Sequence, residues 1–314
     1  MSDMAKQYNY LIIGAGGSGG VLAHDMTRAG LYVTSIARGE HLRAIRANGL
    51  TIRRPWNRTS ECLKIKATDM QHYSERPDVI FLCVKDYSLK DCYSFIRSVS
   101  KRSTIVIPLL NGLISSRKVR EDLPEYTVPG GLIYVSANIS EPGYVEQHGK
   151  LVRVAFGMQN EKDKREIPFL VSEDMKSRGL DVKFTETIER DIFEKFSYVS
   201  PAGTAGLFYG AAAGDFQKPG EPRTMFMTMI REIMTLAFAM GCPFEDDYVK
   251  MNLEIMDGLL PSATTSMQRD VTAGRTSEID ALLFEVLRLG KKYRVSMPAY
   301  EMAAEGIEER YHIH

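Results

Sequence analysis

The feature that most constrains this chain is a glycine-rich run near its N-terminus, Gly14-Ala15-Gly16-Gly17-Ser18-Gly19. It follows an apolar, strand-like run at 10–13 and precedes a helix-like segment at 21–29. In that context the GxGxxG spacing predicts a dinucleotide-binding turn, whose three glycines allow a tight turn, a close approach of the pyrophosphate and close helix packing. The start of the helix would receive the phosphates. A glycine-rich turn without a ligand is the alternative.

Strand-like and helix-like segments alternate through the first half of the chain. We expect strands at 31–37, 79–84, 104–110, 132–139, 152–156 and 181–187, a turn at Glu141-Pro142-Gly143 and a helix at 162–178. From about residue 188 helical spacing dominates, at 188–199, 224–240, 246–260 and 278–289. The sequence therefore predicts an α/β fold, with a Rossmann dinucleotide-binding domain over 1–187 and an all-helical domain over 188–314.

Composition limits the partners of the chain. Its 314 residues include 40 basic and 40 acidic side chains, so the formal net charge is zero and gives no electrostatic case for binding nucleic acid or an anionic membrane. The first nine residues are polar, unlike a signal peptide, and no apolar stretch approaches the ~20 residues of a membrane span. The four cysteines form no CxxC pair and have no histidine at metal-ligand spacing. We expect a reduced, cytoplasmic protein with no metal site.

The balanced total conceals a basic segment at 28–58, which holds seven arginines and one acid, hence 7 − 1 = +6. Arg38 follows the second predicted strand, 19 residues after Gly19, where NAD-binding proteins usually carry an acid for the ribose 2′-hydroxyl. A guanidinium there can grip a 2′-phosphate through charge-assisted hydrogen bonds, so NADP(H) is the predicted cofactor. We assign Arg43, Arg46, Arg53 and Arg54 to a solvated helix and hairpin face.

Two more polar residues follow predicted strands. Lys85 comes directly after the strand at 79–84, and Asn111, followed by Gly112, comes directly after the strand at 104–110. Ligands of open parallel sheets bind beyond the carboxyl ends of the strands, so both residues are expected at the cofactor edge. A loop lysine and an Asn-Gly turn are the structural alternatives.

A lysine and a glutamate in the second half are candidates for proton transfer. Lys195 shares an apolar helical stripe with Ile188, Ile192 and Val199, so it either extends its ammonium to water or is buried for a purpose. Burial would lower its pKa toward the range useful in catalysis. Glu278 precedes an apolar helical segment, where an acid in the first turn is ordinary capping. Ser266, in a polar stretch, suits a substrate contact or a plain loop serine.

These residues together resemble the ketopantoate reductase (2-dehydropantoate 2-reductase) family along nearly the whole chain. The resemblance is carried by the GxGxxG run and by Ala37-Arg38-Gly39, Asn48-Gly49-Leu50, Val84-Lys85, Asn111-Gly112, Glu194-Lys195-Phe196, Ser266-Met267 and Glu278-Ile279-Asp280. It implies a Rossmann domain followed by a helical domain of the 6-phosphogluconate dehydrogenase type. The implied reaction is NADPH-dependent reduction of 2-dehydropantoate to (R)-pantoate in pantothenate, and hence coenzyme A, biosynthesis.

The resemblance also implies roles for the candidate residues. Lys195 would be the general acid, and Glu278 would hold the lysine and a substrate hydroxyl. Asn111 and Lys85 would lie near nicotinamide and substrate, and Ser266 would contact the substrate carboxylate. The partner would be a small-molecule 2-keto acid, with monomer and homodimer both open.

The chain departs from the family pattern where amides are expected to face the substrate. Val199, Ala213 and Ala263 stand at positions where many members carry asparagine. A less polar pocket would favour another branched 2-keto acid, with a related hydroxyacid or imine reductase as a further alternative. A non-catalytic NADP(H)-binding regulator on the same fold is the alternative from another functional class.

Overall fold

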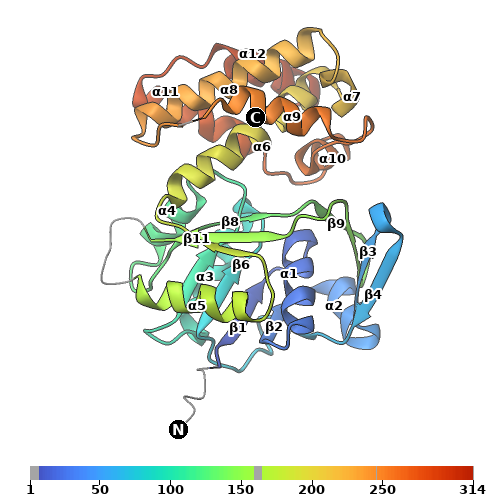
Figure 1. Cartoon of the computed structure of the whole chain (residues 1–314), viewed down its shortest axis with the longest axis vertical. Helices are drawn as coiled ribbons and strands as arrows, with labels where there is room; N and C mark the ends of the chain where they lie inside the picture. The colour runs from blue at the N-terminus through green and yellow to red at the C-terminus, as the bar shows by residue number, and fades with distance from the viewer. Residues whose placement is uncertain (1–6, 159–164, 245, 314) are drawn as a thin grey trace. The chain divides into compact units, whose positions relative to one another are not determined.

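The structure, a computed structural model, describes residues 7–158, 165–244 and 246–313 (Figure 1). The chain divides into two compact units. The first comprises Met1–Leu110 and Ile114–Ile188, and the second comprises Asn111–Leu113 and Glu189–His314. The short segment that follows the strand at 105–108 therefore belongs to the second unit.

The first unit is built on a five-stranded parallel sheet in the order β5-β2-β1-β6-β7. Its strands are β5 (Lys66–Thr68), β2 (Tyr32–Ile36), β1 (Asn9–Ile13), β6 (Val79–Leu82) and β7 (Ile105–Pro108). The order reverses at β1, which pairs with β2 on one side and β6 on the other. The carboxyl end of β1, where the glycine-rich run begins, thus lies at the switch point at which such sheets bind ligands.

Both faces of this sheet are covered, which explains the continuous apolar runs of its strands. On one face Tyr10 and Ile12 pack against α1 (Gly17–Arg28). On the other, Leu11 and Ile13 share a core with α3 (Leu89–Val99) and α4 (Ser115–Asp122). The predicted α/β fold class, with a Rossmann-type N-terminal part and a helical C-terminal part, is confirmed.

Two smaller sheets complete the first unit and correct the predicted strands. One has the order β4-β3-β10-β9 and the other β12-β11-β8. The strands are β3 (Leu50–Arg54), β4 (Thr59–Leu63), β8 (Gly130–Tyr134), β9 (Ala137–Glu141), β10 (Tyr144–Gln147), β11 (Arg153–Gly157) and β12 (Val182–Phe184). The single strand expected at 132–139 is wrong, because the chain leaves one sheet after Tyr134 and enters another at Ala137. The predicted turn at Pro142-Gly143 leads into β10, a strand that the sequence did not predict.

Helix boundaries in the first unit also differ from the expectation. α1 begins at Gly17 rather than at residue 21, so two glycines of the run, Gly17 and Gly19, lie inside the helix. α2 (Gly39–Asn48) starts directly after Arg38, and α5 spans Glu166–Ser177. Residues 162–164 of the predicted helix at 162–178 lie outside the described residues.

The second unit is helical throughout its named elements. They are α6 (Ile188–Tyr209), α7 (Ala213–Phe216), α8 (Glu221–Ala239), α9 (Tyr248–Asp257), α10 (Ser266–Thr272), a π-helical turn (Asp280–Phe284), α11 (Glu285–Tyr293) and α12 (Pro298–Tyr311). α8, α11 and α12 lie side by side (Figure 1). α6 continues ten residues beyond the predicted end at 199 and accommodates Pro201 in its interior.

Candidate functional site

The glycine-rich turn leaves room for a ligand at its centre. Gly14 has φ +102°, and a Cβ there would lie 2.7 Å from the carbonyl oxygen of Cys83. A Cβ at Gly19 would lie 1.9 Å from the carbonyl oxygen of Gly14, so only glycine allows the helix to pack this closely. At Gly16, by contrast, no atom beyond its chain neighbours lies within 4 Å of the Cβ position. The first and third glycines therefore serve packing, and the second presents open backbone.

Hydrogen bonds tie this turn to the end of the second strand. The N–H groups of Gly14 and Ala15 both donate to the carbonyl oxygen of Ile36, each at 3.1 Å. α1 then starts at Gly17, with Gly16 as its N-cap, and the first N–H groups of a helix have no intrahelical acceptor. These donors and the helix dipole suit a pyrophosphate, so the residues present fit a dinucleotide.

Arg38 lies at the same edge of the sheet, two residues after the end of β2. Its side chain is exposed and forms no hydrogen bond or ion pair with any residue that the structure describes. Nearby arginines are engaged: Arg43 pairs with Glu40, and Arg46 donates to Thr68 Oγ1 at 3.1 Å. Arg38 thus presents an exposed side chain on the connection between β2 and α2.

A histidine that the sequence analysis missed holds the glycine-rich turn. Nδ1 of His41 accepts the N–H of Gly143 at 3.0 Å, and Nε2 lies 2.9 Å from the carbonyl oxygen of Ala15. Because Nδ1 accepts, the ring proton is on Nε2 and is donated to Ala15. Burial lowers the pKa of His41, which favours this neutral form. The one signal in the sequence is its place in the first turn of the helix after Arg38.

Lys85 and Ser266 occupy helix starts. Lys85 is partly buried and precedes a short 3₁₀ turn, Asp86–Ser88, after β6. Ser266 is the first residue of α10, where Thr265 forms a capping box with Gln268. The Ser266 hydroxyl makes no hydrogen bond within the described ranges of the chain.

Lys195, Asn111 and Glu278 come together in the second unit although they are far apart in the chain. Nζ of Lys195, on α6, donates to Oδ1 of Asn111 at 3.0 Å. The amide nitrogen of Asn111 in turn lies 3.4 Å from Oε2 of Glu278. The amide of Asn111 therefore faces the lysine with its oxygen and the glutamate with its nitrogen.

Burial dominates the electrostatics of this group. It lowers the pKa of Lys195 to about 8, and the Glu278 carboxylate opposes part of that shift. Glu278 is itself only 3% exposed, so the acid is a buried partner of the lysine as well as the residue that precedes a helix. An ammonium with a pKa near neutrality and a fixed acceptor is equipped to give up and regain a proton.

Two of the three positions that depart from the expected amides lie next to each other. The N–H of Ala213 donates to the carbonyl oxygen of Ala263 at 2.9 Å, and the N–H of Gly214 donates to Pro261 at 2.8 Å. Ala213 is buried, and Val199, on α6, is partly buried one turn after Lys195. The methyl groups at 213 and 263 thus belong to one backbone-paired segment.

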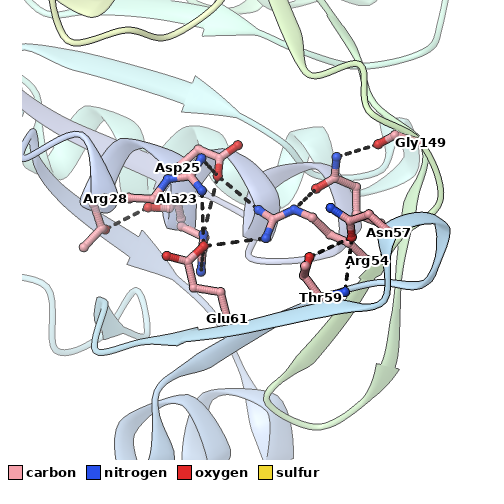
Figure 2. Close-up of polar contacts among 11 residues, drawn as sticks. Ala23, Asp25, Arg28, Arg54, Asn57, Thr59, Glu61 and Gly149 are labelled. Carbon is pink, nitrogen blue, oxygen red and sulfur yellow. Dashed lines mark hydrogen bonds and ion pairs between the residues drawn. The ribbon is translucent and has the colours of Figure 1, made fainter.

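A separate pocket of about 580 Å³ lies beside the C-terminal half of α1 and is lined by both apolar and charged residues of the first unit. Figure 2 shows Arg54 reaching from β3 toward Asp25 of α1 and Glu61 of β4. Arg54 also donates to Gln147 of β10 at 3.0 Å, and its side chain is only 11% exposed. The solvated face predicted for Arg54 is therefore wrong. Its guanidinium instead connects the sheet β4-β3-β10-β9 to α1.

We searched the described residues for a metal-binding cluster and for a membrane-spanning helix. No cluster of three or more His, Cys, Asp or Glu side chains that could hold a metal ion occurs among them. Within the same residues, no helix is long and apolar enough to cross a membrane.

Two family models match the chain in succession. Residues 10–161 match ketopantoate reductase PanE/ApbA, and residues 187–310 match the ketopantoate reductase PanE/ApbA C-terminal domain. Among curated relatives, a 2-dehydropantoate 2-reductase of Pyrococcus horikoshii is 26% identical over 287 residues, which cover 91% of this chain and 92% of the relative.

Solved structures share the fold over almost the full length. A 2-dehydropantoate 2-reductase from Geobacter metallireducens superimposes with a TM-score of 0.85 at 23% identity, over 96% of this chain and 99% of the other. A D-mandelate dehydrogenase in a ternary structure with NADH and anilino(oxo)acetate gives a TM-score of 0.83 at 21% identity, over 96% and 98%. One fold is thus shared by proteins named for different substrates.

Proposed function

Because the chain belongs to the ketopantoate reductase family of oxidoreductases, we propose that it is an NADPH-dependent 2-dehydropantoate 2-reductase of pantothenate biosynthesis. The observation that carries the proposal is the hydrogen-bonded group of Lys195, Asn111 and Glu278. Such a group is what reduction of a ketone requires from the protein, namely a proton donor held in a fixed orientation.

We also propose that the protein is cytoplasmic. Its four cysteines are not paired in disulfides, as is usual for proteins of the cytoplasm.

Lys195 is the general acid in this proposal. A bound nicotinamide dinucleotide would supply the hydride to the carbonyl carbon. Lys195 gives its proton to the carbonyl oxygen, so that C=O becomes CH–OH and the lysine is left as a neutral amine. Its charge stabilises the developing alkoxide, and this electrostatic contribution is usually the largest in such steps. Asn111 orients the amine, Glu278 favours its reprotonation and holds a substrate hydroxyl, and Ser266 receives the substrate carboxylate.

We assign the cofactor as NADPH on the basis of Arg38. Its guanidinium is exposed beside the glycine-rich turn and has no hydrogen-bonding partner among the described residues, so a 2′-phosphate would gain a charge-assisted contact at no loss elsewhere. Lys85 adds a second cation after a neighbouring strand. The D-mandelate dehydrogenase with NADH makes the choice between the two cofactors a point to measure.

A second candidate is reduction of a less polar branched or aromatic 2-keto acid by the same chemistry. It is favoured by the paired alanines 213 and 263 and by Val199, which offer methyl groups where the family resemblance leads us to expect amides. The existence of a D-mandelate dehydrogenase on this fold agrees with such variation. Lys195 and Glu278 keep the same roles in both candidates.

The test follows NADPH oxidation with 2-dehydropantoate and a panel of branched and aromatic 2-keto acids. We expect turnover in the wild type and a loss of at least 100-fold in kcat for Lys195→Met, which keeps the side-chain length without the proton donor. NADPH binding, followed by fluorescence, should be unchanged in that variant. Binding of NADPH without turnover of any panel member would reject the enzyme and favour a non-catalytic regulator.

The cofactor assignment has its own measurement. Arg38→Ala should weaken NADPH binding by about 10- to 100-fold, the value of a lost charge-assisted contact, and leave NADH binding unchanged. Arg43→Ala is the matched control, since Arg43 is paired with Glu40 on the same helix. Equal loss of affinity for both cofactors, or no loss for either, would contradict the contact with the 2′-phosphate.

A further inference from the structure

A π-helical turn begins two residues after Glu278 and leads into α11. The turn spans Asp280–Phe284, and the N–H of Glu285 donates to the carbonyl oxygen of Asp280, five residues back. Leu282 lies in this turn and donates its own N–H to the carbonyl oxygen of Glu278 at 3.0 Å. π-Helical turns are rare in proteins and frequently occur at functional sites. The position of Glu278 is thus linked to that of Leu282.

A buried serine on α6 is hydrogen-bonded to this turn. Oγ of Ser200 lies 2.6 Å from the carbonyl oxygen of Leu282 and 2.6 Å from the hydroxyl of Tyr300. A carbonyl oxygen only accepts, so Ser200 donates to Leu282, and Tyr300 must then donate to Ser200. Both hydroxyls are fully buried, where an unsatisfied polar group would cost free energy. The chain Tyr300–Ser200–Leu282 therefore has one defined direction.

Tyr300 is itself held at the start of α12. The carboxylate of Glu232, on α8, accepts the N–H of Ala299 at 2.8 Å and the N–H of Tyr300 at 3.3 Å. These bonds anchor the first turn of α12, and hence the tyrosine. The fixed end of the hydrogen-bond chain lies at α8 and α12, and its other end is the π turn.

α6 carries both Ser200 and the proposed proton donor, Lys195. Lys195 and Ser200 are five residues apart on α6, about 7.5 Å along a helix axis, and Leu282 is four residues from Glu278. The hydrogen bond from Ser200 to Leu282 therefore connects the segment that carries Lys195 with the segment that carries Glu278. It does so about one helical turn away from each of these two residues. We propose that Ser200, which accepts a hydrogen bond from Tyr300, is a positioning residue. Through its hydrogen bond to the carbonyl oxygen of Leu282 it holds Glu278 in position beside Lys195.

The inference rests on the proposed function, and its test separates the two. Ser200→Ala removes the donor to Leu282 and should let Glu278 move away from Lys195. Because the carboxylate raises the pKa of the lysine, the pKa of Lys195 should fall in this variant by at least half a unit. We would measure it by NMR titration of ¹³C-labelled lysine, which needs no turnover and so remains decisive if no keto acid is reduced.

Activity gives the second readout. In Ser200→Ala, kcat should fall about tenfold and the alkaline limb of its pH profile should move to lower pH, with NADPH affinity unchanged. Tyr300→Phe keeps the bond to Leu282 and should show a smaller change in the same direction. In the double variant the effect of Tyr300→Phe should vanish, since Tyr300 acts through Ser200.

The matched control is Ser197→Ala on the same helix. Ser197 is equally buried but donates to the carbonyl oxygen of Glu194 and accepts from Asn252, not from the π turn. It should lower stability without changing the pKa of Lys195. If the Lys195 titration is the same in wild type, Ser200→Ala and Tyr300→Phe, Ser200 is a packing residue only and the inference fails.

Discussion

At the scale of single residues, the surroundings of Lys195 predict how the reaction rate depends on pH. The pKa of Lys195 is lowered to about 8 by burial, and a general acid must be protonated to work. Reduction of the keto acid should therefore fall above pH 8, by tenfold per unit. Oxidation of the hydroxy acid needs the neutral amine and should rise over the same range. Initial rates of both reactions from pH 6 to 10 test this, and a reduction rate that stays constant through pH 9 would contradict it.

The partner of the lysine gives a second prediction at this scale. Glu278→Gln keeps the shape of the side chain and removes the charge that raises the pKa of Lys195. The alkaline limb of the reduction profile should move to lower pH by about one unit, the size expected for a close charge pair. Glu254→Gln, on the surface of α9, is the control and should leave the profile in place. A limb that moves to higher pH would reject the pairing.

Candidate residues could be picked out from the sequence where their position in the chain suggests a chemical role. Arg38 and Asn111 were identified because they follow strands, and Lys195 because it interrupts an apolar helical stripe. His41, Ser200 and Tyr300 had no such signal, since their importance comes from hydrogen bonds to residues far away in sequence. Ser200 and Tyr300, for example, are 100 residues apart. Asn111 also needed the structure, because its contact with Glu278 spans 167 residues.

At the scale of elements, strands buried on both faces were predicted well and half-exposed strands were not. β1, β6 and β7 are almost fully buried, so each appears as a continuous apolar run. β9 and β10 belong to a small sheet with one exposed face, and their mixed composition hid them. The break between β8 and β9 was invisible for a related reason, because an apolar run continues while the chain changes sheets.

Arg54 leads to a prediction about how that small sheet is held. Its guanidinium is nearly buried and contacts Asp25, Glu61 and Gln147 on three different elements (Figure 2). Arg54→Met keeps the apolar stem but leaves the buried Asp25 with fewer cationic partners, so we expect a loss of about 2 kcal/mol in the free energy of unfolding. Urea unfolding of Arg43→Met is the control. Arg43 pairs on the surface, and its loss should cost under about 1 kcal/mol. Equal effects of the two variants would contradict a structural role for Arg54.

At the scale of the whole molecule, the division into two units predicts which region a bound cofactor should protect from hydrogen exchange. The glycine-rich turn, Arg38 and His41 all belong to the first unit, and their contacts run within it. NADPH should therefore protect the amides of the turn and of the β2–α2 connection from hydrogen exchange. Ligand at 100 times its Kd adds about 2.7 kcal/mol to the state that binds it. That corresponds to roughly 100-fold slower exchange where opening requires release of the cofactor.

His41 provides the discriminating comparison in that experiment. His41→Ala removes the bond to Ala15 and the acceptor of Gly143, so the turn should exchange faster without cofactor, and NADPH should restore less of the protection. His72→Ala is the matched control, because His72 is exposed and bonds locally to Asp69. Protection confined to the helical unit, or spread evenly over both units, would show that the dinucleotide does not bind at the glycine-rich turn. Protection of the turn that is unchanged in His41→Ala would leave the binding site standing and remove the histidine from it.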